Sequence, residues 1–453
     1  MEKFFKLKEH GTTVSTEVLA GFTTFFTMAY ILFVNPSMLA ETGLPQNGVY
    51  IATIFAAITG TLIMGLFANI PYAQASGMGL NAFFTYTVVF KLGYTPYEAL
   101  AMVFVCGIIN ILITVTSIRR QLIAAIPETL KQAIGAGIGL FIAYIGLLNV
   151  GFIEFGAGVP SITENFTDPG ILLFLIGLTI TLVLMLMNVK AAILIGIIAT
   201  TIIGIPMGIV DVTQVSGVGS VSYKAVFNDF FSIFGKALSE EGIVSLFKNH
   251  SLLEVFPIVF AFSLTDTFDT IGTFIGTGRR TGIFTEEDEK ELLEGKGIKS
   301  KMDRGLFADA FATMAGAIFG TSNVTTFVES SSGIEAGGRT GLTSVVVSGL
   351  FFLSIFAAPI VGLVPSQATA PALIIVGILM SSAFADIDWT DFANAIPAFF
   401  TVLMTVLSYS ISNGLAFGFM SYILVQTAIG NVKKIHPIIF VSTIFFLLNF
   451  ILT

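Results

Sequence analysis

Three acidic residues lie in segments that otherwise have the composition of membrane-spanning helices. Asp266 and Asp269 lie within 260-FAFSLTDTFDTIGTFIGTG-278, and their i, i+3 spacing places both carboxylates on one face of a helix. Glu329 lies in 321-TSNVTTFVESSSGIEAGGRTG-341. A carboxylate inside a bilayer is unfavourable by several kcal/mol, so such residues usually face a cavity or a partner. The chemistry they offer is binding a polar solute or carrying a proton, against the plainer alternative of bonding to a neighbouring helix.

The two aspartates are candidates for proton coupling. Two acids on one helix face in a low-dielectric setting resist being ionised together. Asp266, Asp269 or, from the other half of the chain, Glu329 could therefore take up a proton together with a solute. A sodium ion is the alternative coupling ion, because the sequence does not separate the two. No organic cofactor and no bound metal centre are expected.

A short polar segment in the first half of the chain resembles the one around Glu329. It reads 71-PYAQASGMGLNAFFTYT-87, and both segments interrupt an apolar pattern. Gly77 and Gly79 loosen the backbone, and Asn81 adds a donor and an acceptor. Paired interrupted helices at corresponding positions indicate a transporter's binding site. The alternatives are close helix packing for the glycines and an interhelical hydrogen bond for Asn81.

The second segment combines an extended stretch with a helix start. The β-branched residues of 323–328 favour a strand, and Ser330, Ser331 and Ser332 favour the N-cap of a half-helix. The N–H groups of that half-helix would point at a ligand, with Glu329 accepting from ligand N–H groups.

Aromatic residues flank these polar positions. Phe83, Phe84, Phe268 and Phe327 are each more simply explained by core packing than by ligand stacking. With the acids and the asparagine, however, they suggest a planar, uncharged solute with several N–H and C=O groups. An anion is disfavoured by the carboxylates.

The elements that position these residues are membrane helices. Hydrophobic residues make up 55% of the 453 residues and charged residues 11%, whereas a soluble domain has about a quarter charged. Apolar segments of about 20 residues recur between 16 and 452, and runs such as 171-ILLFLIGLTITLVLMLM-187 lack β-barrel alternation. The net charge of −8 argues against nucleic-acid binding, and the single cysteine, Cys106, excludes disulfides within the chain.

The apolar pattern predicts about fourteen spans between 16 and 430, with a further apolar stretch at 436–452 that could span or lie at the interface. The segment 210–250 divides them into two sevens, which would be inverted relative to each other. An amphipathic helix is expected at 225–237 within it. Basic residues place both ends of the fourteen-span core in the cytoplasm. They are Lys3, Lys6, Lys8, Arg119, Arg120, Lys190, Arg279, Arg280, Lys299, Lys301, Arg304, Lys433 and Lys434.

Three strings resemble the AzgA-like purine permeases of the nucleobase–ascorbate transporter family. They are GMGLNAFF (77–84), TDTFDTIGT (265–273) and TTFVESSSGIEAGGRTG (325–341). The resemblance extends from FTTFFTMAYILFVNP (22–36) to IPAFFTVLMTVLSYSISNGLAFGF (396–419), essentially the whole chain.

The resemblance implies an all-α polytopic membrane protein of two inverted seven-span repeats, with short strands in broken spans 3 and 10. The first repeat would cover 1–210, with core spans 1–4 and gate spans 5–7. An extracellular linker would cover 211–250. The second repeat would cover 251–453, with core spans 8–11, gate spans 12–14 and the C-terminal apolar segment.

The resemblance also implies the site, the function and the partners. It carries over Asn81, Asp266, Asp269 and Glu329 as site residues and Asp309 as a supporting residue. Together with the neighbouring residues singled out above, the expected substrate-binding residues are Asn81, Phe268, Asp269, Phe327, Glu329 and Ser330; the expected proton-coupling residues are Asp266, Asp269 and Glu329; the expected supporting residues are Asp309, Gly77 and Gly79. The implied function is import of hypoxanthine, guanine or adenine across the cell membrane by a multi-pass symporter that is not an enzyme. Its partners would be a purine nucleobase and the lipid bilayer, but no nucleic acid, and a homodimer is the candidate assembly. A membrane aspartyl protease is disfavoured because its GxGD string is absent.

Overall fold

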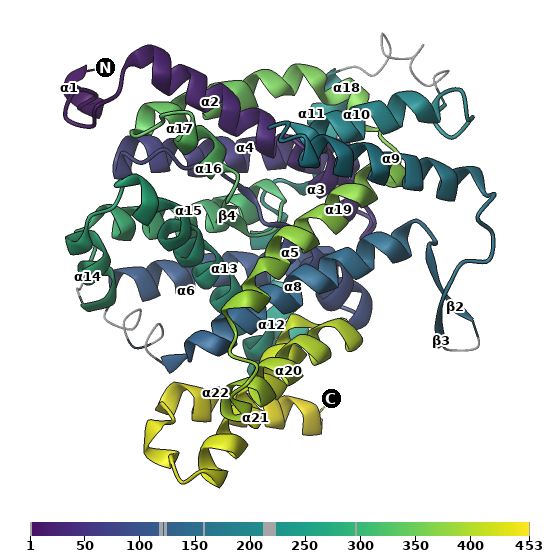
Figure 1. The fold of residues 1–453 in the computed structure, drawn as a ribbon. Helices are drawn as coiled ribbons and strands as arrows, with labels where there is room; N and C mark the ends of the chain where they lie inside the picture. Colours follow the sequence, from purple (N-terminus) through teal and green to yellow (C-terminus); the bar gives the residue numbers. More distant parts are fainter. Residues whose placement is uncertain are drawn as a thin grey trace.

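Helices make up nearly all of the regular structure of this chain (Figure 1). The computed structural model describes residues 2–116, 121, 125–156, 159–211, 223–294 and 297–452. Within them, eight helices are long and apolar enough to cross a membrane, and shorter apolar helices cover Ala192–Gly204, Phe392–Leu407 and Pro437–Leu448. The predicted class of an all-α polytopic membrane protein is confirmed, whereas the number of fourteen spans and their inverted symmetry stay predictions.

The first half of the chain begins with a kinked span and contains one short strand of the later site. Its elements are α1 (Glu2–Phe5), α2 (Val14–Met28), α3 (Ile31–Ala40), α4 (Gln46–Ile63), η1 (Met64–Ala68), β1 (Gln74–Ser76), α5 (Met78–Ala82), η2 (Phe83–Lys91), α6 (Pro96–Val115), α8 (Glu128–Asn149), β2 (Ile153–Gly156), β3 (Val159–Ile162), α9 (Pro169–Leu186) and α10 (Ala192–Gly204). The kink falls at Tyr30, between α2 and α3. The β2–β3 hairpin was not expected from the sequence.

The second half also contains a short strand followed by a short helix, β4 and α16, as β1 and α5 do in the first half. Its elements are α11 (Tyr223–Ile233), η3 (Lys236–Leu238), η4 (Glu240–Val244), α12 (Ser245–Asn249), α13 (Leu252–Thr281), α14 (Glu286–Glu294), α15 (Lys301–Phe319), β4 (Val324–Thr326), α16 (Ser330–Glu335), α17 (Gly341–Leu353), η5 (Ser354–Ala357), α18 (Ala358–Val361), α19 (Ser366–Met380), η6 (Ser381–Asp386), α20 (Phe392–Leu407), α21 (Ile411–Ala428), η7 (Val432–Lys434) and α22 (Pro437–Leu452). The amphipathic helix expected at 225–237 corresponds to α11. The apolar stretch at 436–452 forms α22, which packs on α13 and α21.

Capping sequences fix where several of these helices begin. Thr95 and Glu98 form a capping box at α6, and Ser251 and Glu254 form another at α13. In each, a hydroxyl accepts from a backbone N–H while the acid accepts from the N-cap N–H, so two otherwise unpaired donors are satisfied. The start of α13 is what sets the depth of Asp266 along that helix.

The strands β1 and β4 pair with each other in antiparallel fashion. Ala75 lies opposite Thr325, and the pairing extends at both ends through the bonds from Gly77 N to Asn323 O (2.9 Å) and from Phe327 N to Ala73 O (3.0 Å). Prediction and structure agree here: each interrupted segment contains a short strand.

The long helices form two groups that pack mainly within themselves. The strand bundle consists of α2, α3, α4, α5, α6, α13, α15, α16 and α17 together with β1 and β4. The flanking bundle consists of α8, α9, α10, α19, α20 and α21. In Figure 1 the flanking bundle runs from the upper right through α19 and α8 to α20 and α21 at the bottom. The division into core and gate spans, and the boundaries at 210 and 251, stay predictions.

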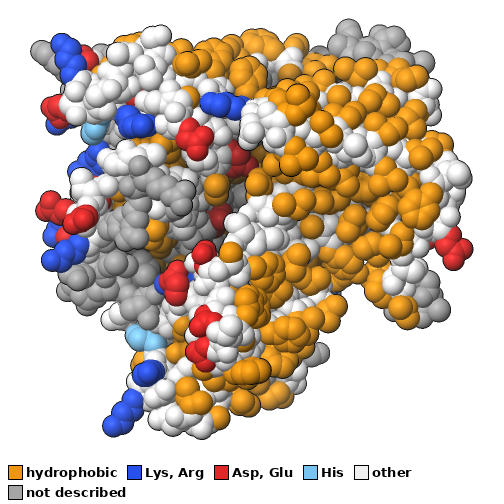
Figure 2. All heavy atoms as spheres, viewed as in Figure 1, with side chains coloured by type: hydrophobic (Ala, Val, Ile, Leu, Met, Phe, Trp, Pro, Cys, Tyr) orange, Lys and Arg blue, Asp and Glu red, His pale blue; other side chains and the backbone are white. Residues whose placement is uncertain are grey.

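The outer surface is largely apolar, unlike the polar surface of a soluble protein. Leu186, Phe392 and Ile451 are 81%, 76% and 77% exposed, and hydrophobic side chains cover most of the right-hand part of Figure 2. Exposed apolar area on this scale indicates contact with lipid. Charged side chains gather at the end that carries the N-terminus and α14. We call this the N-terminal end and the opposite end, with β2 and β3, the hairpin end.

Candidate functional site

Glu329 and Tyr30 form the central polar contact of the candidate site. The Tyr30 hydroxyl, at the kink of the first span, donates to Glu329 Oε1. Thr27 adds a bond from its hydroxyl to the Glu329 carbonyl at 3.4 Å. Tyr30 is 1% exposed while Glu329 is only partly buried. The first span therefore holds one oxygen of the carboxylate, which leaves Glu329 Oε2 for another donor.

Asp269 and two phenylalanines lie around this contact. Asp269 is partly exposed, contacts Thr325 of β4 and lies close enough to Glu329 for their charges to interact. The Phe327 ring lies 6.4 Å from that of Tyr30, centroid to centroid. Phe268 is also partly exposed. Two carboxylates beside aromatic rings can hold a flat ligand by its faces and its N–H edge.

A lysine from the flanking bundle reaches the site. Lys131, one turn into α8, places its ammonium 5.5 Å from the centroid of the Phe268 ring and 3.1 Å from Glu128. This distance permits a cation–π interaction. Lys131 therefore connects the flanking bundle to α13 beside Asp269.

Asp309 of α15 lies behind the strands. It is 2% exposed, and its Oδ1 accepts from Thr270 (2.7 Å), Gln74 (3.0 Å) and Thr326 (3.2 Å). These donors come from α13, β1 and β4, so one carboxylate joins both strands to two helices. Its predicted supporting place is consistent with these bonds.

Asp266 is fully buried beside a second polar network. Its Oδ2 accepts from Asn110 (3.0 Å), Thr313 (3.1 Å) and Asn323 (3.2 Å), whereas its Oδ1 has no hydrogen-bond partner in the described part of the chain. Although Asp266 and Asp269 are three residues apart, they meet different surroundings. The structure thus separates two acids that were both expected, from the sequence, to couple protons.

Asn81 and Ser330 are used within the protein. The Ser322 hydroxyl donates to Asn81 Oδ1, and the Ala73 N–H donates to Ser330 Oγ at 3.1 Å. Both residues are fully buried. Each ties one broken span to the other, which is the interhelical alternative considered for Asn81.

The expected capping of the second half-helix is wrong. The N-cap of α16 is Glu329, with no side-chain capping bond, instead of a serine. The first N–H groups of α16 bond to the preceding turn, from Ser330 to Phe327 O, Ser331 to Val328 O and Ser332 to Glu329 O. These amides are therefore not free to bind a ligand, because the chain turns tightly before a helix of only six residues.

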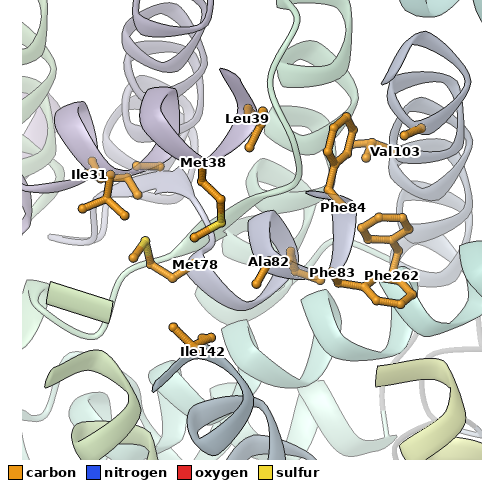
Figure 3. Packing of buried hydrophobic residues seen from close by; sticks show 14 of the residues in the cluster. Ile31, Met38, Leu39, Met78, Ala82, Phe83, Phe84, Val103, Ile142 and Phe262 are labelled. Carbon is orange, nitrogen blue, oxygen red and sulfur yellow. The ribbon is translucent and has the colours of Figure 1, made fainter. Parts of the chain in front are cut away.

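Gly77 and Gly79 allow close approach, as the packing alternative proposed. A Cβ at Gly77 would lie 2.8 Å from Thr325 Cγ2, and one at Gly79 would lie 2.5 Å from Ile138 Cγ2 of α8. Figure 3 shows apolar packing in this part of the core, where Phe83 lies beside Phe262. Phe83 and Phe84 are fully buried and belong to this core.

Four residues of these networks were not predicted from the sequence: Tyr30, Lys131, Asn110 and Asn323. An asparagine in the middle of α6 was a usable signal, because polar residues in apolar spans are rare. Lys131 was placed at a span edge, and Tyr30 resembles any interfacial tyrosine.

The surface is recessed near the candidate site. Figure 2 shows a hollow near the centre of the view, bordered by acidic side chains, between the strand bundle and the flanking bundle. A membrane helix bundle with a polar recess at two interrupted spans is the architecture of a transporter.

Known transporters share this fold. The transmembrane domain of the cyanobacterial bicarbonate transporter BicA superposes with a TM-score of 0.61 at 15% identity, over 88% of this chain and 96% of that one. SLC26A9 superposes with a TM-score of 0.59 at 12% identity, over 92% of this chain and 65% of that one. The protein is thus a multi-pass membrane protein with a transporter fold.

The family follows from sequence comparison. The model described as Permease family matches residues 15–417, so the chain belongs to this family of nucleobase–ascorbate transporters, as the resemblance predicted, and it is not an enzyme. The adenine permease AdeP of Escherichia coli is 38% identical, over 100% of this chain and 96% of its own. The guanine/hypoxanthine permease PbuO of Bacillus subtilis is 40% identical, over 98% and 99%.

Proposed function

We propose that this protein imports purine nucleobases across the cell membrane by proton symport. The observation that carries the proposal is the grouping of Glu329 and Asp269, both partly exposed, with the rings of Phe268, Phe327 and Tyr30. The names of the relatives point to adenine, guanine or hypoxanthine as the substrate.

The carboxylates recognise the N–H edge of the base. Tyr30 occupies Glu329 Oε1, so Oε2 accepts from the base. Asp269, whose charge interacts with that of Glu329, is a second acceptor. A hydrogen bond to an ionised acceptor is roughly twice as strong as a neutral one. The rings of Phe268 and Phe327 contact the flat faces of the base, which restricts the substrate to planar molecules.

Asp269 is the preferred proton carrier among the three acids proposed from the sequence. It is partly exposed and adjoins Glu329, whereas Asp266 is fully buried among Asn110, Thr313 and Asn323. A coupled proton must exchange with water on each side in turn, which favours the accessible acid. Asp266 then keeps the helices together, and the N-terminal end faces the cytoplasm because basic residues gather there.

Uptake into proteoliposomes tests the proposal. Radiolabelled hypoxanthine, guanine and adenine are offered with an imposed inward proton gradient and without sodium. Accumulation that a protonophore abolishes is expected, and Asp269→Asn should lose accumulation but retain exchange of preloaded base. Accumulation that requires sodium and does not respond to the pH gradient would show that sodium, not the proton, is the coupling ion. If none of the three bases is bound or moved, the purine assignment is wrong.

A further inference from the structure

The π-helix η2 connects the site to the seam between the two bundles. It follows α5 directly, and therefore lies a few residues after β1 and Asn81. Three of its residues contact the flanking bundle at the hairpin end: Tyr86, Thr87 and Lys91. One continuous segment thus has one end at the candidate site and the other at the contact surface between the bundles.

Two of these contacts reach the end of α20. The Thr87 hydroxyl donates to the Tyr409 carbonyl at 2.5 Å, and the Lys91 ammonium donates to the Ser408 carbonyl. Ser408 is the C-cap of α20, where helix carbonyls lack partners within the helix and favour a cation. Tyr409 has a φ of 51°, which a residue with a side chain rarely adopts and which turns the chain between α20 and α21.

The third contact reaches the end of α8. Asn149 Nδ2 lies 2.5 Å from the Tyr86 hydroxyl, which in turn donates to Glu41 Oε1 at 3.0 Å. Asn149 also donates to Glu41 Oε1 at 3.2 Å. Glu41 directly follows α3, so a carboxylate of the strand bundle accepts from both residues. The contact joins three elements across the seam.

The two ends of the seam differ. In the portion of the chain that the structure describes, the side-chain hydrogen bonds between the two bundles lie at the hairpin end. Nearer the N-terminal end, the described polar contact between them is that of Lys131 with the Phe268 ring. In this conformation the seam between the bundles is therefore hydrogen-bonded at the hairpin end.

We propose that η2 is the extracellular gate of this transporter, and that Tyr86, Thr87 and Lys91 hold it shut by bonding to Asn149, Tyr409 and Ser408. Opening the site to the outside requires breaking these bonds, and their re-formation closes the site behind the substrate. These are positioning residues, because they set the balance between outward-open and inward-open states without touching the substrate. The inference rests on the proposed transport function.

Weakening the gate should change substrate affinity on one face only. Apparent affinity on each face is the intrinsic affinity reduced by the fraction of molecules open to that face. Because the closed outer gate makes the outward-open fraction small, losing one hydrogen bond should raise apparent external affinity roughly two- to tenfold. Internal affinity should change by less than about twofold while the inward-open state predominates.

Thr87→Val and Lys91→Met test the gate, with Thr85→Val as the matched control. Thr85 is buried in the same segment, but its hydroxyl donates to the Met38 carbonyl at 3.4 Å, within the strand bundle. Purine binding is measured on right-side-out and inside-out vesicles. The two gate variants should gain external affinity and Thr85→Val should not. External affinity unchanged in both gate variants, or an equal loss on both faces, would overturn the gate.

A second measurement needs no substrate and so separates this inference from the proposed function. Hydrogen–deuterium exchange is followed in the peptides covering 83–92 and 405–414. Exchange should accelerate in both peptides together in Thr87→Val, whereas Thr85→Val should leave 405–414 unchanged. No acceleration at 405–414 in Thr87→Val would overturn the gate, even in a protein that binds no purine.

Discussion

Two pairs of carboxylates in this molecule look alike in the sequence and lie in opposite environments. Asp266 and Asp309 are fully or almost fully buried, and each accepts three side-chain hydrogen bonds. Asp269 and Glu329 are partly exposed, and Glu329 accepts from Tyr30. An acid in a membrane span is therefore not a ligand by default, because its hydrogen-bond partners decide whether it stabilises the fold or faces the solute.

The contrast is sharpest within α13. Asp266 and Asp269 are one turn apart, yet Asp266 lies against α6 and the residue before β4, while Asp269 faces Thr325. A buried carboxylate is tolerated only where donors satisfy it. Asn110, Thr313 and Asn323 supply those donors to Asp266.

The largest expected effect is on stability, at Asp309. Asp309→Ala removes the buried acceptor of Thr270, Gln74 and Thr326, of which Gln74 keeps a second bond to Thr326 Oγ1. Each donor left unpaired in the interior is unfavourable by about 1–3 kcal/mol. We expect unfolding to become easier by about 3–5 kcal/mol and the purified protein to melt at a clearly lower temperature.

Asp309→Asn is the control, since its amide oxygen can still accept from the same donors. It should lose much less stability than the alanine variant. An alanine variant that melts like the wild type would show that Asp309 does not stabilise the fold. The contrast between the buried pair, Asp266 and Asp309, and the partly exposed pair, Asp269 and Glu329, would then be wrong.

Glu329→Gln should give the next largest effect, and on binding instead of stability. The side chain keeps its shape but loses charge, and a hydrogen bond to a charged group is worth about 1.5–3 kcal/mol. Purine affinity should fall at least about tenfold. Competition binding and melting temperature are measured on the same preparation. A variant that binds purine normally contradicts the substrate-binding role of Glu329. A variant that loses as much stability as Asp309→Ala would show that Glu329 stabilises the fold, as Asp309 does.

The general plan of the molecule could be predicted from local sequence. The membrane class follows from composition, and the strand at Val324–Thr326 follows from the β-branched residues of 323–328. The strand at Gln74–Ser76 was implied only by the family resemblance. Asp266, Asp269 and Glu329 could be singled out, since charge within apolar sequence is visible without a structure. Both kinds of signal are contained in about 20 neighbouring residues.

Other features depend on contacts between distant segments. The role of Tyr30 arises because a kink brings it to a glutamate 299 residues later. Lys131 matters because α8 packs beside α13. The expectation of serine capping failed because three successive N–H groups bond within the turn that brings Glu329 to the N-cap. Residue type and spacing contain none of this information.

Asn81→Ala should give a smaller loss of stability and no change in substrate preference. Its Oδ1 accepts from Ser322, and both side chains are fully buried. Losing this bond should destabilise the protein by about 1–2 kcal/mol, while adenine, guanine and hypoxanthine keep their order in competition assays. Ser322→Ala, which removes the partner, should behave alike. A changed order at an unchanged melting temperature would instead make Asn81 a ligand, as the family resemblance implies.

The smallest expected effect is at Lys131, and it tests whether the flanking bundle contributes to the substrate site around Asp269 and Glu329. The ammonium lies 5.5 Å from the Phe268 ring and is paired with Glu128 near the surface, so the cation–π contact is worth about 0.5–1 kcal/mol. Lys131→Gln should weaken purine affinity by about two- to fivefold if the lysine orients the ring against the base. Lys131→Arg keeps the charge above the ring and should retain affinity, whereas simple loss of side-chain packing would affect both variants.

The decisive comparison is with Phe268→Leu, which removes the ring. Once the ring is absent, Lys131→Gln should cause no further loss of purine affinity. If the two losses of affinity add in full, Lys131 acts independently of the Phe268 ring, and the substrate site is formed by the strand bundle alone.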